Sequence, residues 1–297
     1  MPDILAPGLY LVATPIGNLG DITLRALEVL KSADRIACED TRQTQKLLNH
    51  YGIATPTISY HQHNERDRAA KLIEDLKEGA RIAVVSDAGM PGVSDPGSVL
   101  VREAIAAGVP VIPIPGANAA LSALIASGLS SDDFHFLGFL PEKAGARRTR
   151  LESIAEQPRD TAQTVILYEA PHRVADTLAD LEAVFGSALR MVAARELTKL
   201  HEEFLRGTVA EVRAKLADRD RIRGEFVLLI EAPVNSSNAG AARLASETRE
   251  TISDQIKRLQ SESGLDEKEA LKRLARESGK SKSELYRELQ RERAKRK

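Results

Sequence analysis

The chain of 297 residues is 42% hydrophobic and 29% charged, the composition of a globular protein with about two or three domains. No apolar run reaches the roughly 18 residues that a membrane span needs, and the N-terminus lacks the basic start of a secretory signal. The single cysteine, Cys38, excludes an internal disulfide and a multi-cysteine zinc site. We therefore expect a cytoplasmic protein that makes no membrane contact.

The net charge of −1 conceals an uneven distribution along the chain. Residues 241–297 contain 16 Lys and Arg against 11 Asp and Glu, so this segment carries +5 and the rest of the chain −6. A basic tail on a mildly acidic body favours a polyanionic partner, although a solubilising terminus explains the same composition equally well.

The first part of the chain alternates apolar runs with helical patterns. Strands are expected at 9–14, 35–39, 57–60, 81–86 and 109–115. Helices are expected between them, at 22–33, 41–52, 65–79 and 97–107. Asp21 precedes the first of these helices and is the expected N-cap residue.

A second series of the same kind begins near Gly116. Helices are expected at 118–128, 146–157, 172–186 and 209–218, and strands at 134–140, 164–170, 189–198 and 225–232. This alternation predicts two α/β lobes with mainly parallel sheets, residues 1–116 and 117–233. A polar linker at 233–240 leads to residues 241–297, which read as a small all-helical domain of helix-turn-helix shape. Its expected core residues are Leu271, Leu274, Leu285 and Leu289.

Three loops rich in glycine and proline each follow a predicted strand of the first lobe, at 14–21, 86–97 and 113–120. Because the carboxyl ends of parallel strands meet at one edge of a sheet, the loops indicate a site for a nucleotide-like cofactor there. None of them matches the G-x-G-x-x-G or G-x-x-x-x-G-K-[ST] pattern, which disfavours a dinucleotide or a triphosphate. Exposed backbone groups of this kind suit an adenosine joined to an amino acid.

Several motifs carry a resemblance to a known family. The segments "SDAGMPGVSDPG", "PGANAALSAL", "YEAPHR", "ARELTKLHEE" and "GEFVLLIE", with the first 34 residues from Leu9, closely resemble the branch of the tetrapyrrole methylase superfamily that methylates small-subunit ribosomal RNA. The resemblance covers about residues 8–297, and Met90–Pro91–Gly92 is a small departure from the usual pattern. It implies two α/β lobes with S-adenosyl-L-methionine in the cleft between them, a homodimer, and 2′-O-methylation of a cytidine in the decoding region. The partner implied is the small-subunit ribosomal RNA or the assembled small ribosomal subunit.

The same resemblance implies a set of cofactor contacts. These are Pro15, Asp87, Ala88, Gly89, Pro91, Val93, Asn118, Ala119 and Tyr168, with Ala194 and Glu225 from the second lobe. Small side chains at Ala88 and Gly89 let the backbone approach a ligand, and Asn118 can also cap its helix. Core packing is the alternative explanation for Val93 and Ala194.

A ribose hydroxyl is a weak nucleophile, so a base or a charge beside it should assist the reaction. Candidates in "CEDTR" and "ARELTKLHEE" are Glu39, Asp40, Arg42, Arg195, Glu196 and Lys199. We favour Glu196 and Lys199 as the catalytic pair. The alternative is that these residues form ion pairs at a lobe or dimer interface.

Other polar motifs have less specific interpretations. The pair His61 and His63 has metal-ligand spacing without obvious further ligands, so no metal is expected. His172 is expected to cap a helix or line the cleft, and Cys38 to be packed. The basic residues Arg147, Arg148 and Arg150 are phosphate-contact candidates, or else a solvated helix face.

Two other functions remain open at this stage. One is a tetrapyrrole-type methyltransferase for a small molecule, which would not need a basic helical appendage. The other is a non-catalytic RNA-binding factor in ribosome assembly, which would not need intact cofactor loops.

Overall fold

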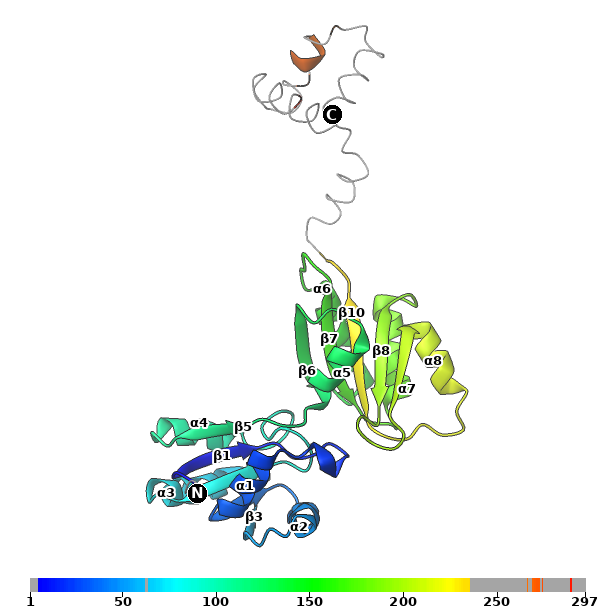
Figure 1. Cartoon of the computed structure of the whole chain (residues 1–297). Helices are drawn as coiled ribbons and strands as arrows, with labels where there is room; N and C mark the ends of the chain where they lie inside the picture. Colours follow the sequence, from blue (N-terminus) through cyan, green and yellow to red (C-terminus); the bar gives the residue numbers. More distant parts are fainter. Residues whose placement is uncertain are drawn as a thin grey trace. The chain divides into compact units, whose positions relative to one another are not determined.

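The computed structural model describes residues 5–61 and 64–235, with Asp266, residues 269–272, Leu274 and Leu289. The chain divides into two compact units, Met1–Asn235 and Ser236–Lys297. Two α/β lobes make up the described part of the first unit, and each is built on a five-stranded sheet (Figure 1).

The sheet of the first lobe is parallel throughout. Its strands are β1 (Gly8–Val12), β2 (Arg35–Cys38), β3 (Thr57–Ser59), β4 (Arg81–Val85) and β5 (Val111–Ile114), paired in the order β3-β2-β4-β1-β5. Its helices are α1 (Leu24–Ser32), α2 (Thr41–His50), α3 (Glu65–Lys77) and α4 (Ser98–Ala106). The predicted order of strands and helices is confirmed for this lobe.

Both faces of this sheet are buried. Tyr10 and Val12 of β1 pack in one core with α1 and α2, whereas Leu9 packs in the other core with α3 and α4. Successive side chains of a strand point to opposite faces, so a sheet covered on both sides requires a nearly continuous apolar run. The carboxyl ends of β1, β4 and β5 therefore reach one edge of a rigid, layered lobe.

The start of α1 differs from the expectation. A short 3₁₀ helix, η1 (Leu19–Asp21), precedes it and includes Asp21, which is therefore not the cap of α1. The N-cap is Thr23, whose hydroxyl accepts a hydrogen bond from the N–H of Ala26 at 3.1 Å. The prediction for Asp21 was wrong because the chain makes an extra turn before the helix begins.

The second lobe has a mixed sheet. Its strands are β6 (Phe134–Phe139), β7 (Gln163–Glu169), β8 (Arg190–Arg195), β9 (Glu203–Thr208) and β10 (Phe226–Ala232), in the order β6-β7-β10-β8-β9. Its helices are α5 (Ala119–Ser127), α6 (Ala144–Glu156), α7 (Val174–Phe185) and α8 (Val209–Ala217). Only β6 and β7 pair in parallel, so the expectation of a mainly parallel sheet was wrong for this lobe.

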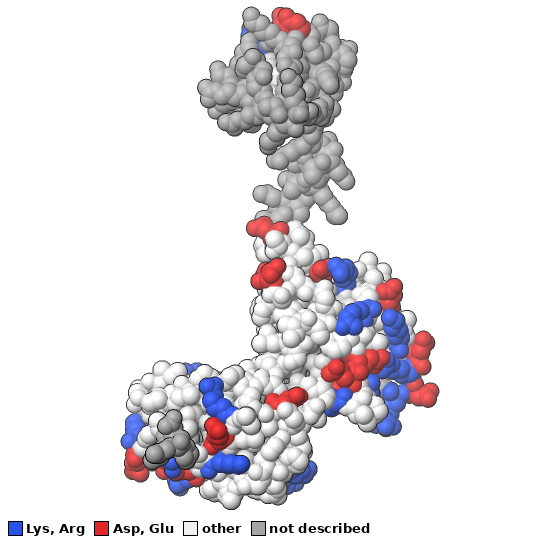
Figure 2. All heavy atoms as spheres, viewed as in Figure 1, with Lys and Arg blue, Asp and Glu red and all other residues white. Residues whose placement is uncertain are grey.

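The difference comes from two strands. β9 was not expected; it returns antiparallel along β8 after a short connection, which a parallel pair could not use. β10 then enters between β7 and β8 and runs antiparallel to both. Helices α6, α7 and α8 pack against one face of the sheet and α5 against the other. On the side of this lobe that Figure 2 shows, Lys and Arg gather together with Asp and Glu at the right, and most of the remaining visible surface carries no charge.

Few residues of the second unit are described. Leu271, Leu274 and Leu289 are buried, as expected for its core, together with Ala270. Leu285, the linker and most of the predicted tail helices lie outside the described residues. Within the described chain, no helix combines the length and apolarity needed to cross a membrane.

Candidate active site

A cavity of about 460 Å³ opens where the loops of the first lobe meet the second lobe. The first lobe contributes residues that follow β1, β2 and β4, and the second lobe contributes the start of α5, the ends of β6 and β7, the segment after β8 and the start of β10. This volume lies in the range of small-molecule and cofactor sites. The lining residues are Ile16, Glu39, Asp87, Ala88, Gly89, Met90, Val93, Ser94, Asp95, Asn118, Ala119, Phe139, Tyr168, Glu169, Ala170, Pro171, Leu197, Lys199, Glu225, Phe226 and Val227.

The loop after β4 is held by backbone hydrogen bonds to the loop after β1. The N–H of Thr14 donates to the carbonyl of Gly89 at 2.9 Å, and the N–H of Gly89 donates back to Thr14 at 3.0 Å. Gly89 has a φ of +79°, and a Cβ there would lie 3.3 Å from the Ile16 side chain. Glycine adopts this backbone conformation without strain, so the loop can present bare backbone to the cavity.

Asn118 and Ala119 enter the cavity because of how α5 begins. The Asn118 Oδ1 accepts a hydrogen bond from the N–H of Leu121 at 3.0 Å, which confirms its expected role as the N-cap of this helix. The cap fixes the Asn118 side chain at the cavity wall and places Ala119, the first helical residue, beside it.

A charged bridge forms the opposite wall. The Lys199 ammonium donates to the Glu196 carboxylate at 2.9 Å and to the Glu225 carboxylate at 2.8 Å. The N–H of Glu225 donates to the same Glu196 oxygen at 3.0 Å. A Cβ at Gly17 would collide with the methylenes of Lys199, so this glycine lets the lysine cross from the second lobe against the first.

The charge states of this bridge follow from its contacts. Burial acts to raise the pKa of Glu196, but hydrogen bonds from Lys199 and from the Glu225 N–H outweigh it and hold that pKa below its usual range. Burial acts to lower the pKa of Lys199, and the two carboxylates outweigh it in turn and raise that pKa. Lys199 therefore stays a cation and supplies charge, and it does not accept a proton.

The backbone of the bridge is also constrained. Glu196 and Thr198 have φ values of +50° and +66°, in the left-handed region that non-glycine residues rarely adopt. The N–H of Thr198 donates to the Glu202 carboxylate at 2.6 Å, and the N–H of Glu196 donates to the Glu225 carbonyl at 3.0 Å. Strained residues persist where such contacts over-determine them, and they gather at functional sites.

Two carboxyl groups of the first lobe have environments that favour their neutral form. Burial raises the pKa of Asp95 to about 6, and the neighbouring Glu39 carboxylate adds to the shift. The pKa of Glu39 is raised as well, first by burial and then by Asp87. A carboxylate with such a pKa is a better proton acceptor near neutral pH than one of ordinary pKa.

An aromatic wall lies at the ends of β6 and β7. The Tyr168 ring makes edge-to-face contacts with Phe136 and Phe139, with centroids 5.0 and 5.7 Å apart. Glu169 follows Tyr168 at the end of β7, and its buried carboxylate accepts a hydrogen bond from Thr177 at 2.6 Å and pairs with Arg173 at 3.2 Å.

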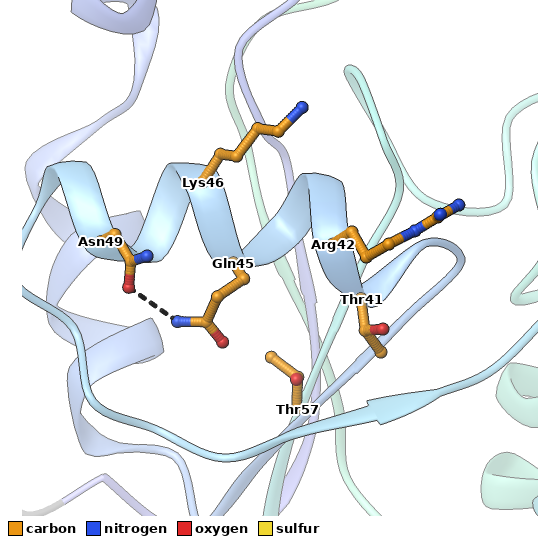
Figure 3. Close-up of a pocket in the computed structure, with 6 residues that line it drawn as sticks. All are labelled: Thr41, Arg42, Gln45, Lys46, Asn49 and Thr57. Carbon is orange, nitrogen blue, oxygen red and sulfur yellow. Dashed lines mark hydrogen bonds between the residues drawn. The ribbon is translucent and has the colours of Figure 1, made fainter.

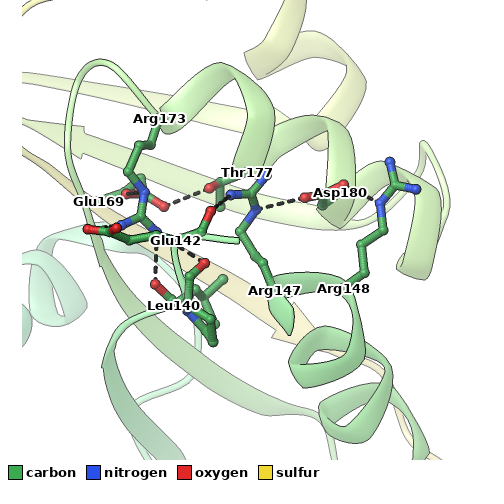
Figure 4. Close-up of polar contacts among 9 residues, drawn as sticks. Leu140, Glu142, Arg147, Arg148, Glu169, Arg173, Thr177 and Asp180 are labelled. Carbon is green, nitrogen blue, oxygen red and sulfur yellow. Dashed lines mark hydrogen bonds and ion pairs between the residues drawn. The ribbon is translucent and has the colours of Figure 1, made fainter. Parts of the chain in front are cut away.

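Arg173 also donates to the carbonyl of Leu140 at 2.8 Å (Figure 4). The guanidinium thus ties the end of β6 to the end of β7 and supports the aromatic wall.

Of the three basic residues of α6 expected to contact phosphate, the structure excludes Arg147. Arg147 is 4% exposed, and its Nε donates to the Asp180 carboxylate at 2.7 Å. Arg148 donates to the other oxygen of Asp180 at 2.5 Å (Figure 4). The phosphate prediction and its alternative, a solvated face, were both wrong for Arg147, because α7 supplies a buried acid opposite it. Arg150 is partly buried.

Most residues expected at the site are brought together by the fold. Asp87, Ala88, Gly89, Val93, Asn118, Ala119, Tyr168, Glu225 and Lys199 line the cavity. Glu196 supports Lys199 from outside the lining, and Pro15 lines a neighbouring cavity. Pro91 and Ala194 are buried and do not line either one, and Ala194 packs in the core under α5. The assignment of all these residues to a cofactor or to catalysis stays a prediction.

Some lining residues were not singled out from the sequence. Asp95 stands in the quoted loop "SDAGMPGVSDPG", yet nothing in the pattern marked it as more buried than Asp87. Phe139 and Leu197 fell within the strands expected at 134–140 and 189–198, and neither was given a role in the site. The one feature of the sequence that could have indicated their place in the cavity wall was their position next to polar loops.

The structure also places the histidines and the cysteine that the sequence analysis discussed. His61 is described, whereas Gln62 and His63 lie outside the described residues; within the described chain no three His, Cys, Asp or Glu side chains gather as metal ligands do. His172 is exposed in the turn before α7, and it neither caps that helix nor lines the cavity. Cys38 is fully buried, which confirms its packed role.

Two α/β lobes that share one cavity, walled by backbone loops on one side and fixed charges on the other, define a two-lobed α/β protein with an enzyme-like site. The model of the family "Tetrapyrrole (Corrin/Porphyrin) Methylases" matches residues 8–213. The chain is 56% identical over 223 residues to "Ribosomal RNA small subunit methyltransferase I" of Halalkalibacterium halodurans, which covers 75% of each chain. It is 48% identical over 250 residues to the protein of the same name from Haemophilus influenzae, covering 84% of this chain and 87% of that one.

Solved structures show the same fold. Uroporphyrin-III C-methyltransferase from Thermus thermophilus, complexed with S-adenosyl homocysteine, matches with a TM-score of 0.53 at 18% identity, covering 75% of this chain and 96% of that one. The chain belongs to the tetrapyrrole methylase family, in the group of the ribosomal RNA small subunit methyltransferases I.

Proposed function

We propose that this protein is an S-adenosyl-L-methionine-dependent methyltransferase that acts on small-subunit ribosomal RNA. Membership of a methylase family and relatives named as ribosomal RNA small subunit methyltransferases support the proposal. The observation that carries it is the shared cavity, in which bare backbone and small side chains face a cluster of carboxylates.

The residues present suit this cofactor. S-adenosylmethionine is a nucleoside joined to an amino acid, and it carries a positive sulfonium and an ammonium group. Ala88, Gly89 and Ala119 leave room for close approach, Val93 and Tyr168 supply apolar contact, and Asp87 and Glu225 supply negative charge. When bound, the cofactor supplies an activated methyl group.

The roles of the chain's own residues follow from the geometry. The loop around Gly89 and the cap at Asn118 orient the ligand, and orientation supplies much of the rate of a transfer between two bound groups. A carboxylate at the cavity wall, Asp95 or Glu39, takes the proton of the acceptor hydroxyl. Lys199, held by Glu196 and Glu225, stabilises the negative charge that develops on the hydroxyl oxygen.

The finer assignment is 2′-O-methylation of a cytidine in the decoding region, by a homodimer in the cytoplasm. The sequence resemblance supports this assignment. The three lobe and tail segments, residues 1–116, 117–233 and 241–297, are proposed as two catalytic lobes and an accessory domain.

The test is incubation of the full chain with methyl-labelled cofactor and one of three acceptors: naked small-subunit ribosomal RNA, assembled small subunits, or a tetrapyrrole. Nuclease mapping locates the label, and resistance of the neighbouring phosphodiester to alkali shows that the ribose 2′-oxygen carries it. Label in an alkali-resistant cytidine step supports the proposal. Label in a base refutes the ribose assignment, and label in the tetrapyrrole alone supports the small-molecule alternative. RNA binding with no cofactor binding by calorimetry supports the assembly factor.

A further inference from the structure

A second cavity of about 530 Å³ adjoins the first. It lies between the loop after β1, helix α2 and the charged bridge. The two cavities share Ile16, Asp87, Ala88, Lys199 and Glu225. They therefore meet at the segment Asp87–Ala88 of one lobe and at the Lys199–Glu225 pair of the other. A ligand in the second cavity would touch the same bridge as a ligand in the first.

Helix α2 lines this second cavity with polar groups and no acid: Gln43, Thr44, Lys46 and His50, with Leu47 between them. Thr44 is 4% exposed, and among the described residues its hydroxyl has no partner apart from the weak Cys38 thiol. A buried hydroxyl without a strong partner is unusual, because leaving it unpaired costs free energy. The Thr44 side chain lines the second cavity, and its hydroxyl oxygen is itself buried in the wall.

A polar groove continues along the outer side of the same helix. Its lining residues are Thr41, Arg42, Gln45, Lys46, Asn49 and Thr57 (Figure 3). Figure 3 shows the Gln45 and Asn49 amides pointing toward one another, and they share a hydrogen bond of 2.8 Å. Lys46 lines both the groove and the second cavity, so it stands between them.

Helix α2 and the segment that follows it carry no acidic residue, and the acids that line the second cavity, Asp87 and Glu225, come from other segments. Residues 41–64 contain no Asp or Glu at all, although 43 of the 297 residues in the chain are acidic. Arg42 is partly compensated by Asp40, with which it pairs at 3.1 Å. Lys46 donates to the Gln43 amide at 2.9 Å and has no acidic partner within the described chain. Amides, hydroxyls and a cation without an acidic partner, such as Lys46, are groups that bind phosphates, riboses and base edges of RNA.

We propose that the second cavity holds the nucleotide that accepts the methyl group, and that the outer side of α2 binds the phosphates of its neighbours in a single-stranded segment. The inference rests on the proposed function, because it places the acceptor against the bridge that the cofactor cavity shares. The reacting oxygen would lie at the junction, where Lys199 is present. Lys46 then contacts the phosphate next to the acceptor nucleotide.

The experiment compares Lys46→Ala and Lys46→Glu with the matched control Lys31→Glu. Lys31 is exposed on α1 and lines neither cavity nor groove. Each protein is assayed for cofactor affinity by calorimetry, for KM and kcat with ribosomal RNA, and for RNA affinity at several salt concentrations. Lys46→Ala should raise the KM for RNA about tenfold, the usual worth of a charge-assisted contact. The slope of log affinity against log salt should fall by about 0.7, and cofactor affinity should stay unchanged.

Thr44→Val tests the cavity itself. Valine matches the shape of threonine and lacks the hydroxyl, so the fold should tolerate it. The expected result is a lower kcat/KM for RNA with unchanged cofactor affinity.

If the wild-type chain methylates RNA and both the Lys46 and Thr44 variants match it in KM and salt slope, the second-cavity assignment is wrong by itself. If the wild-type chain transfers no label to RNA, the proposed function fails, and the inference fails with it. If Lys31→Glu weakens RNA binding as much as Lys46→Glu does, the loss comes from the change in net charge alone, and the assignment of RNA binding to α2 is wrong.

Discussion

The two lobes contribute different chemistry to one cavity. The first lobe, with its parallel sheet buried on both faces, presents loops at the carboxyl ends of β1 and β4. The second lobe has a mixed sheet and presents side chains held in ion pairs, such as Lys199 with Glu196 and Glu225.

The two lobes therefore differ in the kind of charge that they bring to the cavity. A loop of glycine and small residues, fixed by backbone hydrogen bonds, can match the outline of a ligand, and the charged side chains that line the cavity from the first lobe are the acids Glu39, Asp87 and Asp95. Ion pairs within one lobe keep a cation in place before any ligand arrives, so no reorganisation is needed at the moment of reaction. Variants of the two lobes should therefore fail in different assays, and four predictions test this.

The largest effect is expected from the buried ion pair of the second lobe. Arg147→Ala should lower the free energy of unfolding by about 3 kcal/mol or more, because it removes one partner of a buried pair and leaves Asp180 with Arg148 alone. Chemical denaturation measures this change. Arg150→Ala, on the same helix, should stay within about 0.5 kcal/mol of the wild type. Equal stabilities of the two variants would contradict the structural role of Arg147.

Removing the cation of the bridge should affect turnover and leave cofactor affinity nearly unchanged. Lys199→Ala should lower kcat by about 10²-fold, the order of magnitude of one donor that stabilises a developing oxyanion. Glu196→Ala should have a smaller effect, because Glu225 still holds the ammonium. Lys215→Ala, an exposed lysine of α8, is the control. Near-normal turnover in Lys199→Ala would move the search for the electrostatic group to Arg42 and Arg195.

The corresponding change in the first lobe should affect cofactor affinity. Gly89→Val adds a branched side chain at a φ of +79° and against Ile16, so the loop must shift away from its cavity position. Cofactor affinity should fall by more than about tenfold, or about 1.4 kcal/mol, in calorimetry. Gly145→Val is the control, since a Cβ at Gly145 meets no atom within 4 Å. Unchanged affinity in a folded Gly89→Val protein would remove this loop from the cofactor site.

The smallest effect is expected from Asp95, one of the three acids that line the cavity from the first lobe. Its pKa is raised from 3.8 to about 6 by burial, so the folded protein binds the proton more tightly than the unfolded chain. The contribution of Asp95 to the stability of the wild type therefore falls as pH rises from about 4 to about 6. Asp95→Asn should be more stable than the wild type at pH 7.5, on the order of 1 kcal/mol, and the gain should vanish below about pH 4.

Thermal unfolding across that pH range checks the Asp95 prediction. The same variant should lose the rise in activity that the wild type shows as pH passes through about 6, if Asp95 is the proton acceptor. An unchanged pH profile would point to Glu39.

Much of this arrangement could be predicted from the sequence, for local reasons. The three loops follow apolar runs, and Asn118 stands directly before a helical pattern, so short-range patterns sufficed to place them. The antiparallel strand β9 was missed because its sequence, Glu203–Thr208, alternates only weakly and follows a charged loop. Asp21 and Thr23 are both good N-cap residues, and only the extra turn η1 decides between them.

By itself, then, the sequence determined the two lobes, the loops at the carboxyl ends of the first sheet and the caps, because these depend on residues close together in the chain. Only the tertiary structure decided that Arg147 is buried against Asp180, that Lys199 bridges Glu196 and Glu225 while crossing Gly17, and that Asp95 titrates near pH 6. The physical reason is that charge and pKa depend on burial and on partners many residues away, and no local pattern records either.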